Sequence, residues 1–145
     1  MKPELGDPFI PGWQGYPPAM PTGDYEIWIR YRHELAGMFD AIYFNVRVGE
    51  PTAFPADTPP EMAAMVQALS RRRIDVAARN KDHWLLVELK FNAGTEALGQ
   101  ILMYKALWDL DPPDPLPVSL AIVSDRANKD LILACKYYNI SLIVV

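Results

Sequence analysis

Residues 71–104 read RRRIDVAARNKDHWLLVELKFNAGTEALGQILMY, and this stretch decides the fold. Its first part, residues 73–79, is a short apolar and β-branched run, and residues 84–91 form a second one. The polar residues 80–82 lie between the two runs. Two such runs joined by a polar loop predict a β-hairpin.

Three charged residues of this hairpin fall on one face. Successive strand residues point to opposite faces of a sheet, so Glu88 and Lys90 share a face. A two- or four-residue turn centred on Asn80 and Lys81 puts Asp75 opposite Leu86, diagonal to Glu88 and about 7–8 Å from it on the same face. A three- or five-residue turn would send Asp75 to the other face.

The second strand is apolar on both faces around residues 85–87, which is typical of a covered central strand. Charges buried there cost several kcal/mol each unless they have partners. Mg²⁺ is a natural partner, since it prefers one or two carboxylates together with water and phosphate oxygens. The alternative is that Glu88 and Lys90 are solvated residues on the wet face of a hairpin.

Asp75 followed by Glu88-Leu89-Lys90 after a hairpin resembles the PD-(D/E)XK nuclease superfamily. The run from Gln100 to Tyr104 matches the QxxxY element of the RecB-like branch of that superfamily. The resemblance extends from about residue 24 onward. One position departs from the family pattern, because Ile74 stands where the family has proline.

The resemblance implies a metal-dependent nuclease that hydrolyses phosphodiester bonds of DNA and leaves 5′-phosphate and 3′-hydroxyl ends. Asp75, Glu88 and the backbone carbonyl of Leu89 would bind Mg²⁺, for which Mn²⁺ should substitute. Lys90 would orient or activate the attacking water. In the superfamily the first helix often offers the metal a glutamate, for which Glu34 is our candidate, with Glu26 behind it; alternatively Glu34 is an ordinary surface residue.

Substrate contacts are expected from the next helix and from a basic cluster. Gln100 and Tyr104 are four residues apart and share a helix face, which in the RecB-like branch lies over the site. Alternatively, Gln100 is an exposed helix residue and Tyr104 a core aromatic. Arg73 and Arg79 belong to a group of basic residues that either contacts DNA or forms a solvated helix end; the group also contains Arg71, Arg72 and Lys81.

Composition sets further limits. The chain has 145 residues and a net charge of −4, so one domain is expected and tight non-specific DNA binding by a monomer is disfavoured. The single cysteine, Cys135, excludes an internal disulfide and a four-cysteine cluster. His33 and His83 have no further ligands at useful spacing, which argues against zinc. With no apolar run of about 18 residues and no apolar secretion signal, we expect no membrane span and a cytoplasmic protein.

The domain organisation is an N-terminal arm, residues 1–23, followed by one nuclease-like domain, residues 24–145. The arm holds six prolines and four glycines, which exclude a helix, but also several large apolar residues. We therefore expect an extended arm packed on its own domain or on a neighbouring subunit.

The remaining periodic segments complete an α/β pattern. Helices are expected at 24–37, 59–70, 93–110 and 127–138, and strands at 39–48, 118–124 and 141–145. Ile42, Phe44, Val46 and Val48 should share one face of the first strand, and the Met-rich face of the 59–70 helix should be core rather than a cofactor site. The order suits a mixed sheet with helices on both faces, and it matches the αβββαβ restriction-endonuclease-like core with one inserted helix.

Two other readings stay open. The chain could be a non-catalytic DNA-binding or structural assembly protein on the same fold, or an unrelated α/β domain in which the motif is accidental. A nuclease of this size lacks a separate recognition domain, so a homodimer or a targeting partner protein is expected to supply targeting.

Overall fold

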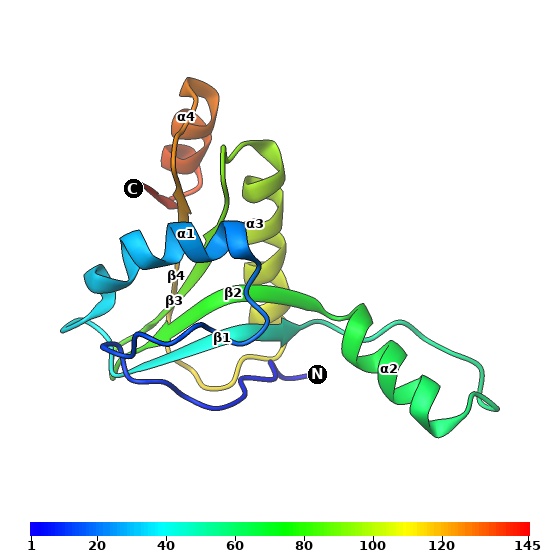
Figure 1. Cartoon of the computed structure of the whole chain (residues 1–145). Coiled ribbons are helices and arrows are strands. Elements are labelled where there is room, and N and C mark those ends of the chain that lie inside the picture. The colour runs from blue at the N-terminus through cyan, green and yellow to red at the C-terminus, as the bar shows by residue number, and fades with distance from the viewer.

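The computed structural model describes all 145 residues and contains one five-stranded mixed sheet (Figure 1). The strands lie in sequence order, so β3 is central: β1 (Ala41–Val48), β2 (Arg72–Arg79), β3 (Trp84–Leu89), β4 (Val118–Ser124) and β5 (Ser141–Val144). β2 pairs antiparallel with both β1 and β3, whereas β4 pairs parallel with both β3 and β5. The predicted α/β class with a mixed sheet is confirmed.

Helices cover both faces of the sheet. The covering helices are α1 (Thr22–Tyr31) with the 3₁₀ turn η1 (Arg32–Leu35), α3 (Thr95–Leu110) and α4 (Lys129–Tyr137), whereas α2 (Pro60–Ser70) lies outside the sheet. α1 lies on one face, and α3 with α4 lies on the other (Figure 1). This arrangement is consistent with a restriction-endonuclease-like core. None of the helices has the length and apolar character needed to cross a membrane.

Each face of the sheet has its own apolar core. Ile101 and Trp108 of α3 belong to the core that contains Leu86, and Ile27 and Trp28 of α1 belong to the core that contains Val87; all six side chains are at most 2% exposed. Burying a large apolar side chain stabilises the fold by about 1.5–3 kcal/mol. The two cores therefore fix α1 and α3 on opposite sides of β3.

The hairpin register differs from the prediction by two residues. Val76 pairs with Val87 and Ala77 with Leu86, and one more step along this ladder brings Asp75 opposite Glu88 rather than Leu86. The loop is displaced because the side-chain oxygen of Asn80 accepts hydrogen bonds from the backbone amides of Asp82 and His83. These bonds close a turn over residues 80–83. Asp75 lies between Ile74, in the core beneath α3, and Val76, in the core beneath α1, so the regular alternation of faces is interrupted at this residue.

The first strand changes face at Asn45. Ile42 and Phe44 belong to the core beneath α1, whereas Val46 and Val48 belong to the core beneath α3. Asn45 has φ of +54°, a left-handed conformation that interrupts the regular alternation. The prediction that all four apolar residues share one face is therefore wrong, although all four are buried.

The inserted helix α2 projects away from the body of the molecule (Figure 1). None of its residues is buried, and Met62, Met65 and Leu69 are 56%, 60% and 64% exposed. The prediction that its Met-rich face is core is wrong, because no other element of the chain packs on that face.

The N-terminal arm packs on its own domain along the outer edge of β1. Backbone hydrogen bonds join Phe9 to Ile42 in both directions at 2.8 Å, and Glu4 pairs with Arg47 in the same antiparallel sense. The arm thus covers an edge strand that would otherwise present unpaired amides and carbonyls.

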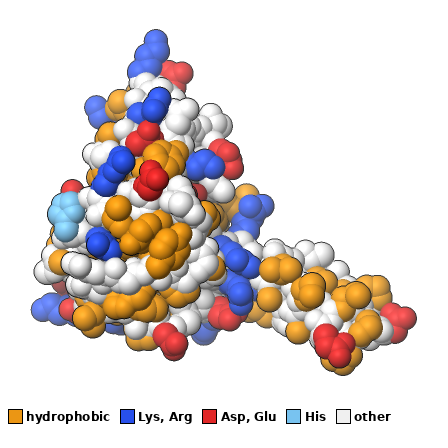
Figure 2. Space-filling model, in the orientation of Figure 1, with side chains coloured by type: hydrophobic (Ala, Val, Ile, Leu, Met, Phe, Trp, Pro, Cys, Tyr) orange, Lys and Arg blue, Asp and Glu red, His pale blue; other side chains and the backbone are white.

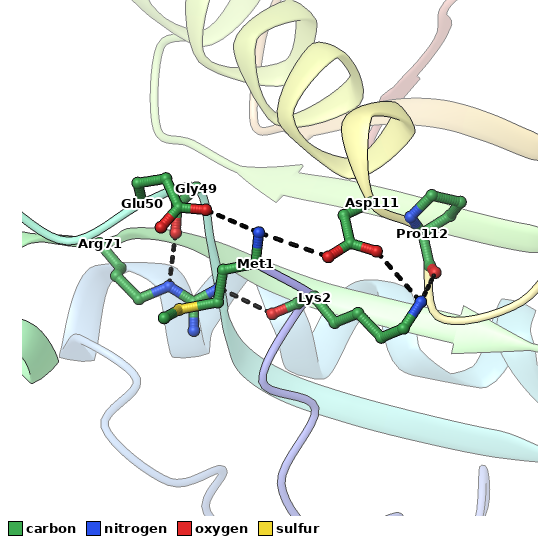
Figure 3. A network of polar contacts seen from close by, with 7 residues as sticks. All are labelled: Met1, Lys2, Gly49, Glu50, Arg71, Asp111 and Pro112. Carbon is green, nitrogen blue, oxygen red and sulfur yellow. Dashed lines mark hydrogen bonds and ion pairs between the residues drawn. The ribbon is translucent and has the colours of Figure 1, made fainter.

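A polar network fixes the start of this arm (Figure 3). The buried Arg71 donates from Nε to the carbonyl of Gly49 at 2.7 Å and from Nη2 to the carbonyl of Lys2 at 2.8 Å. Lys2 in turn pairs with Asp111 at the end of α3, at 3.1 Å. Hydrogen bonds from a charged donor are worth about 1.5–3 kcal/mol, so Arg71 is a main anchor between the arm and the sheet.

Candidate functional site

Two carboxylates meet where β2 separates from β3. The paired ladder between these strands ends at Val76 and Val87. Beyond that point the side chain of Asp75 replaces the backbone as an acceptor, since its Oδ2 receives a hydrogen bond from the amide of Leu89 at 2.8 Å. This bond fixes the Asp75 carboxylate beside Glu88.

Glu88 lies in the middle of the sheet and is 4% exposed. Its Oε2 is buried and has no hydrogen-bond partner. Burial raises the pKa of Glu88 most strongly, and the negative charges of Asp75 and Asp24 raise it further. A buried oxygen without a donor is costly, so this position favours either a proton or a cation.

The same forces act on Asp75. Burial raises its pKa, the hydrogen bond from the Leu89 amide opposes that shift, and the charge of Asp24 adds to it. The two acids also lie within hydrogen-bonding reach of each other. Two carboxylates so close in a dry environment repel each other when both are ionised.

The third acid near this pair is Asp24, which was not among the predicted site residues. α1 begins earlier than predicted, at Thr22, and its cap position is Pro21, so Asp24 lies in the first turn. Burial raises the pKa of Asp24, and the nearby charge of Lys90 opposes that shift. The sequence signal that could have identified Asp24 as a site residue was its position as an acid in the first turn of a helix that faces the sheet.

Glu34, the predicted helical ligand, lies elsewhere. It is exposed in η1, ten residues beyond Asp24, which corresponds to about 15 Å along a helix. Glu26 is also exposed. The structure brings neither glutamate to the pair of Asp75 and Glu88; Asp24 lies there instead.

Lys90 follows β3 directly and is held in place by its backbone amide, which donates to the carbonyl of Val123 at 3.0 Å. Its positive charge lowers the pKa of Asp24, Asp75 and Glu88, so its ammonium group lies close to all three acids. The ammonium is 3.6 Å from the exposed carboxylate of Glu96. Such an exposed pair is worth little, so Lys90 can leave it readily.

Both predicted residues of α3 face this site. Tyr104 is 5% exposed, and its hydroxyl lies within hydrogen-bonding reach of the Glu88 carboxylate. Burial and the charge of Glu88 raise the pKa of Tyr104, so the hydroxyl keeps its proton as a donor. Gln100 is half-buried, and its Oε1 is buried without a partner.

The two predicted basic contacts have different positions. Arg79 lies at the turn end of β2, where its Nε pairs with Asp114 at 3.0 Å, so the structure does not bring it to the acids. Arg73 lies two residues before Asp75 on the same strand and makes no ion pair. Arg72 is exposed beside it, and its charge lowers the pKa of Tyr104.

The residues present fit a divalent cation held by two carboxylates. No group of three or more His, Cys, Asp or Glu side chains is arranged to hold a metal ion. The charge of Asp24 raises the pKa of both Asp75 and Glu88. Mg²⁺ commonly uses one or two carboxylates and takes its other ligands from water and substrate. The unpartnered oxygen of Glu88 and the mutual repulsion with Asp75 are what such an ion would relieve.

Access to Asp75 is narrow on the side of the N-terminal arm. A recess of about 20 Å³ is lined by Asn45, Asp75 and the arm residues 18–21. A space of this size admits about one water molecule.

Comparisons with known proteins bear on the fold alone. No family model matches the sequence, and no curated protein matches it. The structure is similar to the crystal structure of protein VC1899 from Vibrio cholerae, with a TM-score of 0.52 and 15% sequence identity. The match covers 83% of this chain and 29% of that chain, so this chain spans less than a third of the length of VC1899.

Proposed function

We propose that the chain is a metal-dependent nuclease of the PD-(D/E)XK type that hydrolyses phosphodiester bonds of DNA. The observation that carries the proposal is the buried Glu88 with the half-buried Asp75 beside it and Lys90 two residues further on. Glu88 has an unpartnered oxygen inside the sheet, which costs stability and serves no packing role. Strained, destabilising charge of this kind is concentrated at functional sites.

Asp75 and Glu88 hold the cation in this proposal. When bound, Mg²⁺ or Mn²⁺ shields the negative charge of the phosphate and makes water a better nucleophile. The hydrogen bond from Leu89 to Asp75 supports the site, because it fixes one carboxylate before the ion arrives. Binding of the ion displaces the protons that the raised pKa values retain on the two acids.

Lys90 contributes positive charge at the reacting phosphate and orients the attacking water. Its ammonium group is flexible and only loosely held by Glu96, so it can turn toward an incoming anion. Tyr104 positions the Glu88 carboxylate through its hydroxyl, and it is therefore a positioning residue. Gln100 brings an unpartnered amide to the same face of α3, where it can contact the phosphate or a water.

The proposed substrate is DNA, which the site meets through its backbone. Arg72 and Arg73 precede Asp75 on β2 and have no acidic partner within the chain, so in the monomer they can contact phosphates. Two contacts of this kind give weak, salt-dependent binding. The net charge of −4 agrees with weak binding by the isolated chain.

The test is incubation of the purified protein with linear, nicked, branched and single-stranded DNA in the presence of Mg²⁺ or Mn²⁺. Cleavage should require the metal and should be lost in Glu88→Gln. Glu34→Gln is the matched control, because Glu34 is an exposed glutamate remote from the pair, and it should cut like the natural chain. Metal-dependent cutting that persists in Glu88→Gln would contradict the proposal.

A second candidate is a non-catalytic assembly protein on the same fold. The observation that favours it is the projecting α2, whose apolar side chains have no partner within the chain. This alternative predicts that every DNA form stays intact with either metal, while the protein still associates through α2.

A further inference from the structure

α2 has two different sides. Ala64, Gln67 and Ala68 line a cavity of about 360 Å³ between the helix and the body of the molecule. The opposite side carries Met62, Met65, Val66 and Leu69, spaced as one apolar stripe along the helix. Three of these four are more than half exposed. Monomeric proteins rarely present such a stripe to water, so a partner is expected to cover it.

The charges near α2 divide between its two ends (Figure 2). Glu61 lies in the first turn and Asp57 just before the helix, and both are exposed. Arg72 and Arg73 follow the other end directly. None of these four residues makes an ion pair within the chain. The helix is therefore acidic at its N-terminal end, basic just beyond its C-terminal end and apolar between them.

This distribution excludes two kinds of partner. A nucleic acid or an anionic membrane surface would meet the acidic N-terminal end, and α2 itself contains no Lys or Arg to attract phosphates. A second copy of the same helix is complementary, provided that it runs in the opposite direction. The acidic N-terminal end of each helix then lies against the arginines that follow the C-terminal end of the other helix. The antiparallel arrangement of the two helix dipoles is also favourable.

We propose that α2 pairs with α2 of a second copy of this chain, antiparallel about a two-fold axis, to form a homodimer. The stripe of Met62, Met65, Val66 and Leu69 forms the apolar centre of the interface. Asp57 and Glu61 of each copy meet Arg72 and Arg73 of the other. Such an interface is isologous and closes on itself, so it yields a dimer and no larger assembly.

The interface is small. Standard interfaces bury about 800 Å² on each partner, and an 11-residue helix offers less than that. We therefore expect a micromolar dimer that weakens as salt is raised, since its ion pairs are exposed. Sedimentation equilibrium on the full chain, from low to several hundred micromolar, measures this association.

Substitution of the apolar stripe tests the contact surface. Met65→Asp should weaken the dimer at least about tenfold, while the melting temperature at low concentration stays unchanged because Met65 is 60% exposed. The control Met38→Asp changes a methionine that is 61% exposed outside α2 and should leave the association unchanged.

Charge reversal tests the antiparallel orientation. Asp57→Lys with Glu61→Lys in one chain, and Arg72→Glu with Arg73→Glu in another, should each weaken self-association, because both ends then carry like charge. A mixture of the two variants should recover a heterodimer, since opposite charges meet at both ends. The control Glu26→Lys with Glu34→Lys makes the same charge change at exposed sites outside α2 and should have no effect.

Several results would overturn the proposal. They are a natural chain that stays monomeric throughout, a dimer that Met65→Asp does not weaken, and reversed variants that fail to recover when mixed. Binding of DNA or anionic vesicles that depends on Met65, without any dimer, would also overturn it. These measurements do not depend on nuclease activity.

Discussion

Asp75 reaches from β2 to β3, where its Oδ2 accepts a hydrogen bond from the backbone amide of Leu89 at 2.8 Å. The hairpin ladder ends at Val76 and Val87, and beyond it this bond joins the two strands through a side chain in place of a backbone carbonyl. The protein thereby fixes two acids together inside the sheet without supplying a donor for one oxygen of Glu88.

Above about pH 9, where Glu88 of the natural chain ionises, Glu88→Gln should stabilise the metal-free protein, and the variant should lose its response to metal. The amide keeps the shape of the side chain and cannot ionise, so it avoids a buried charge that costs roughly 1–3 kcal/mol. Thermal melting with and without Mn²⁺ measures both effects. Glu34→Gln, the exposed control, should melt like the natural chain and keep its shift with metal. An unchanged Mn²⁺ shift in Glu88→Gln would contradict the assignment.

The stability of the metal-free protein should fall as pH rises. The folded-state pKa is raised to about 7 for Asp75 and to about 9 for Glu88, against ordinary values near 4. The folded chain therefore binds more protons than the unfolded chain between these values, so the stabilisation is complete below about pH 4 and is lost through pH 7 to 9. Urea unfolding across this range should show the loss, and a flat profile in Asp75→Asn with Glu88→Gln would identify its source. A natural chain whose stability rises steadily over this range would contradict the prediction.

Lys90→Met should separate binding from chemistry. Methionine keeps most of the length of the side chain but removes its positive charge, so DNA cleavage should be lost while Mn²⁺ still raises the melting temperature. Lys81→Met is the matched control, because Lys81 is exposed in the hairpin loop and should leave cleavage unchanged. Full cleavage by Lys90→Met would remove Lys90 from the mechanism.

Asn45→Val should destabilise the fold by about 1–2 kcal/mol, because a β-branched residue tolerates φ of +54° poorly. Asn45→Gly is the control, since glycine adopts this conformation without strain. Urea unfolding of both variants measures the difference. An equal loss of stability in both variants would show that the Asn45 side chain, and not its backbone conformation, stabilises the fold.

Arg71→Met should lower the free energy of unfolding by roughly 2–4 kcal/mol, since it removes two charge-assisted hydrogen bonds to the carbonyls of Gly49 and Lys2. It should also release the N-terminal arm to limited proteolysis. Arg30→Met, at an exposed position without an ion pair, should change neither property. An arm that stays protected in Arg71→Met would show that its pairing with β1 suffices.

Local sequence patterns predicted the elements and the class of fold well, because alternation and helical periodicity directly reflect burial. The hairpin and the central position of β3 both follow from such patterns. The pairing register of β2 with β3 could not be predicted from these patterns. Asn80 closes a turn that lies further along the chain than the polar residues suggested.

What the patterns could not predict depends on contacts between distant residues. The apolar stripe of α2 looks like that of a core helix, and periodicity does not say whether a partner comes from the same chain. The change of face at Asn45 depends on one backbone angle. Asp24 reaches the acids only because α1 crosses the sheet with its first turn above them, which no local pattern contains.

The most direct test of the central claim is the anomalous diffraction of crystals soaked in Mn²⁺. The account predicts one Mn²⁺ ion between the carboxylates of Asp75 and Glu88, and no ion at that position in Glu88→Gln. Anomalous density that is absent from this pair, in crystals where both acids keep the positions described, would contradict the claim.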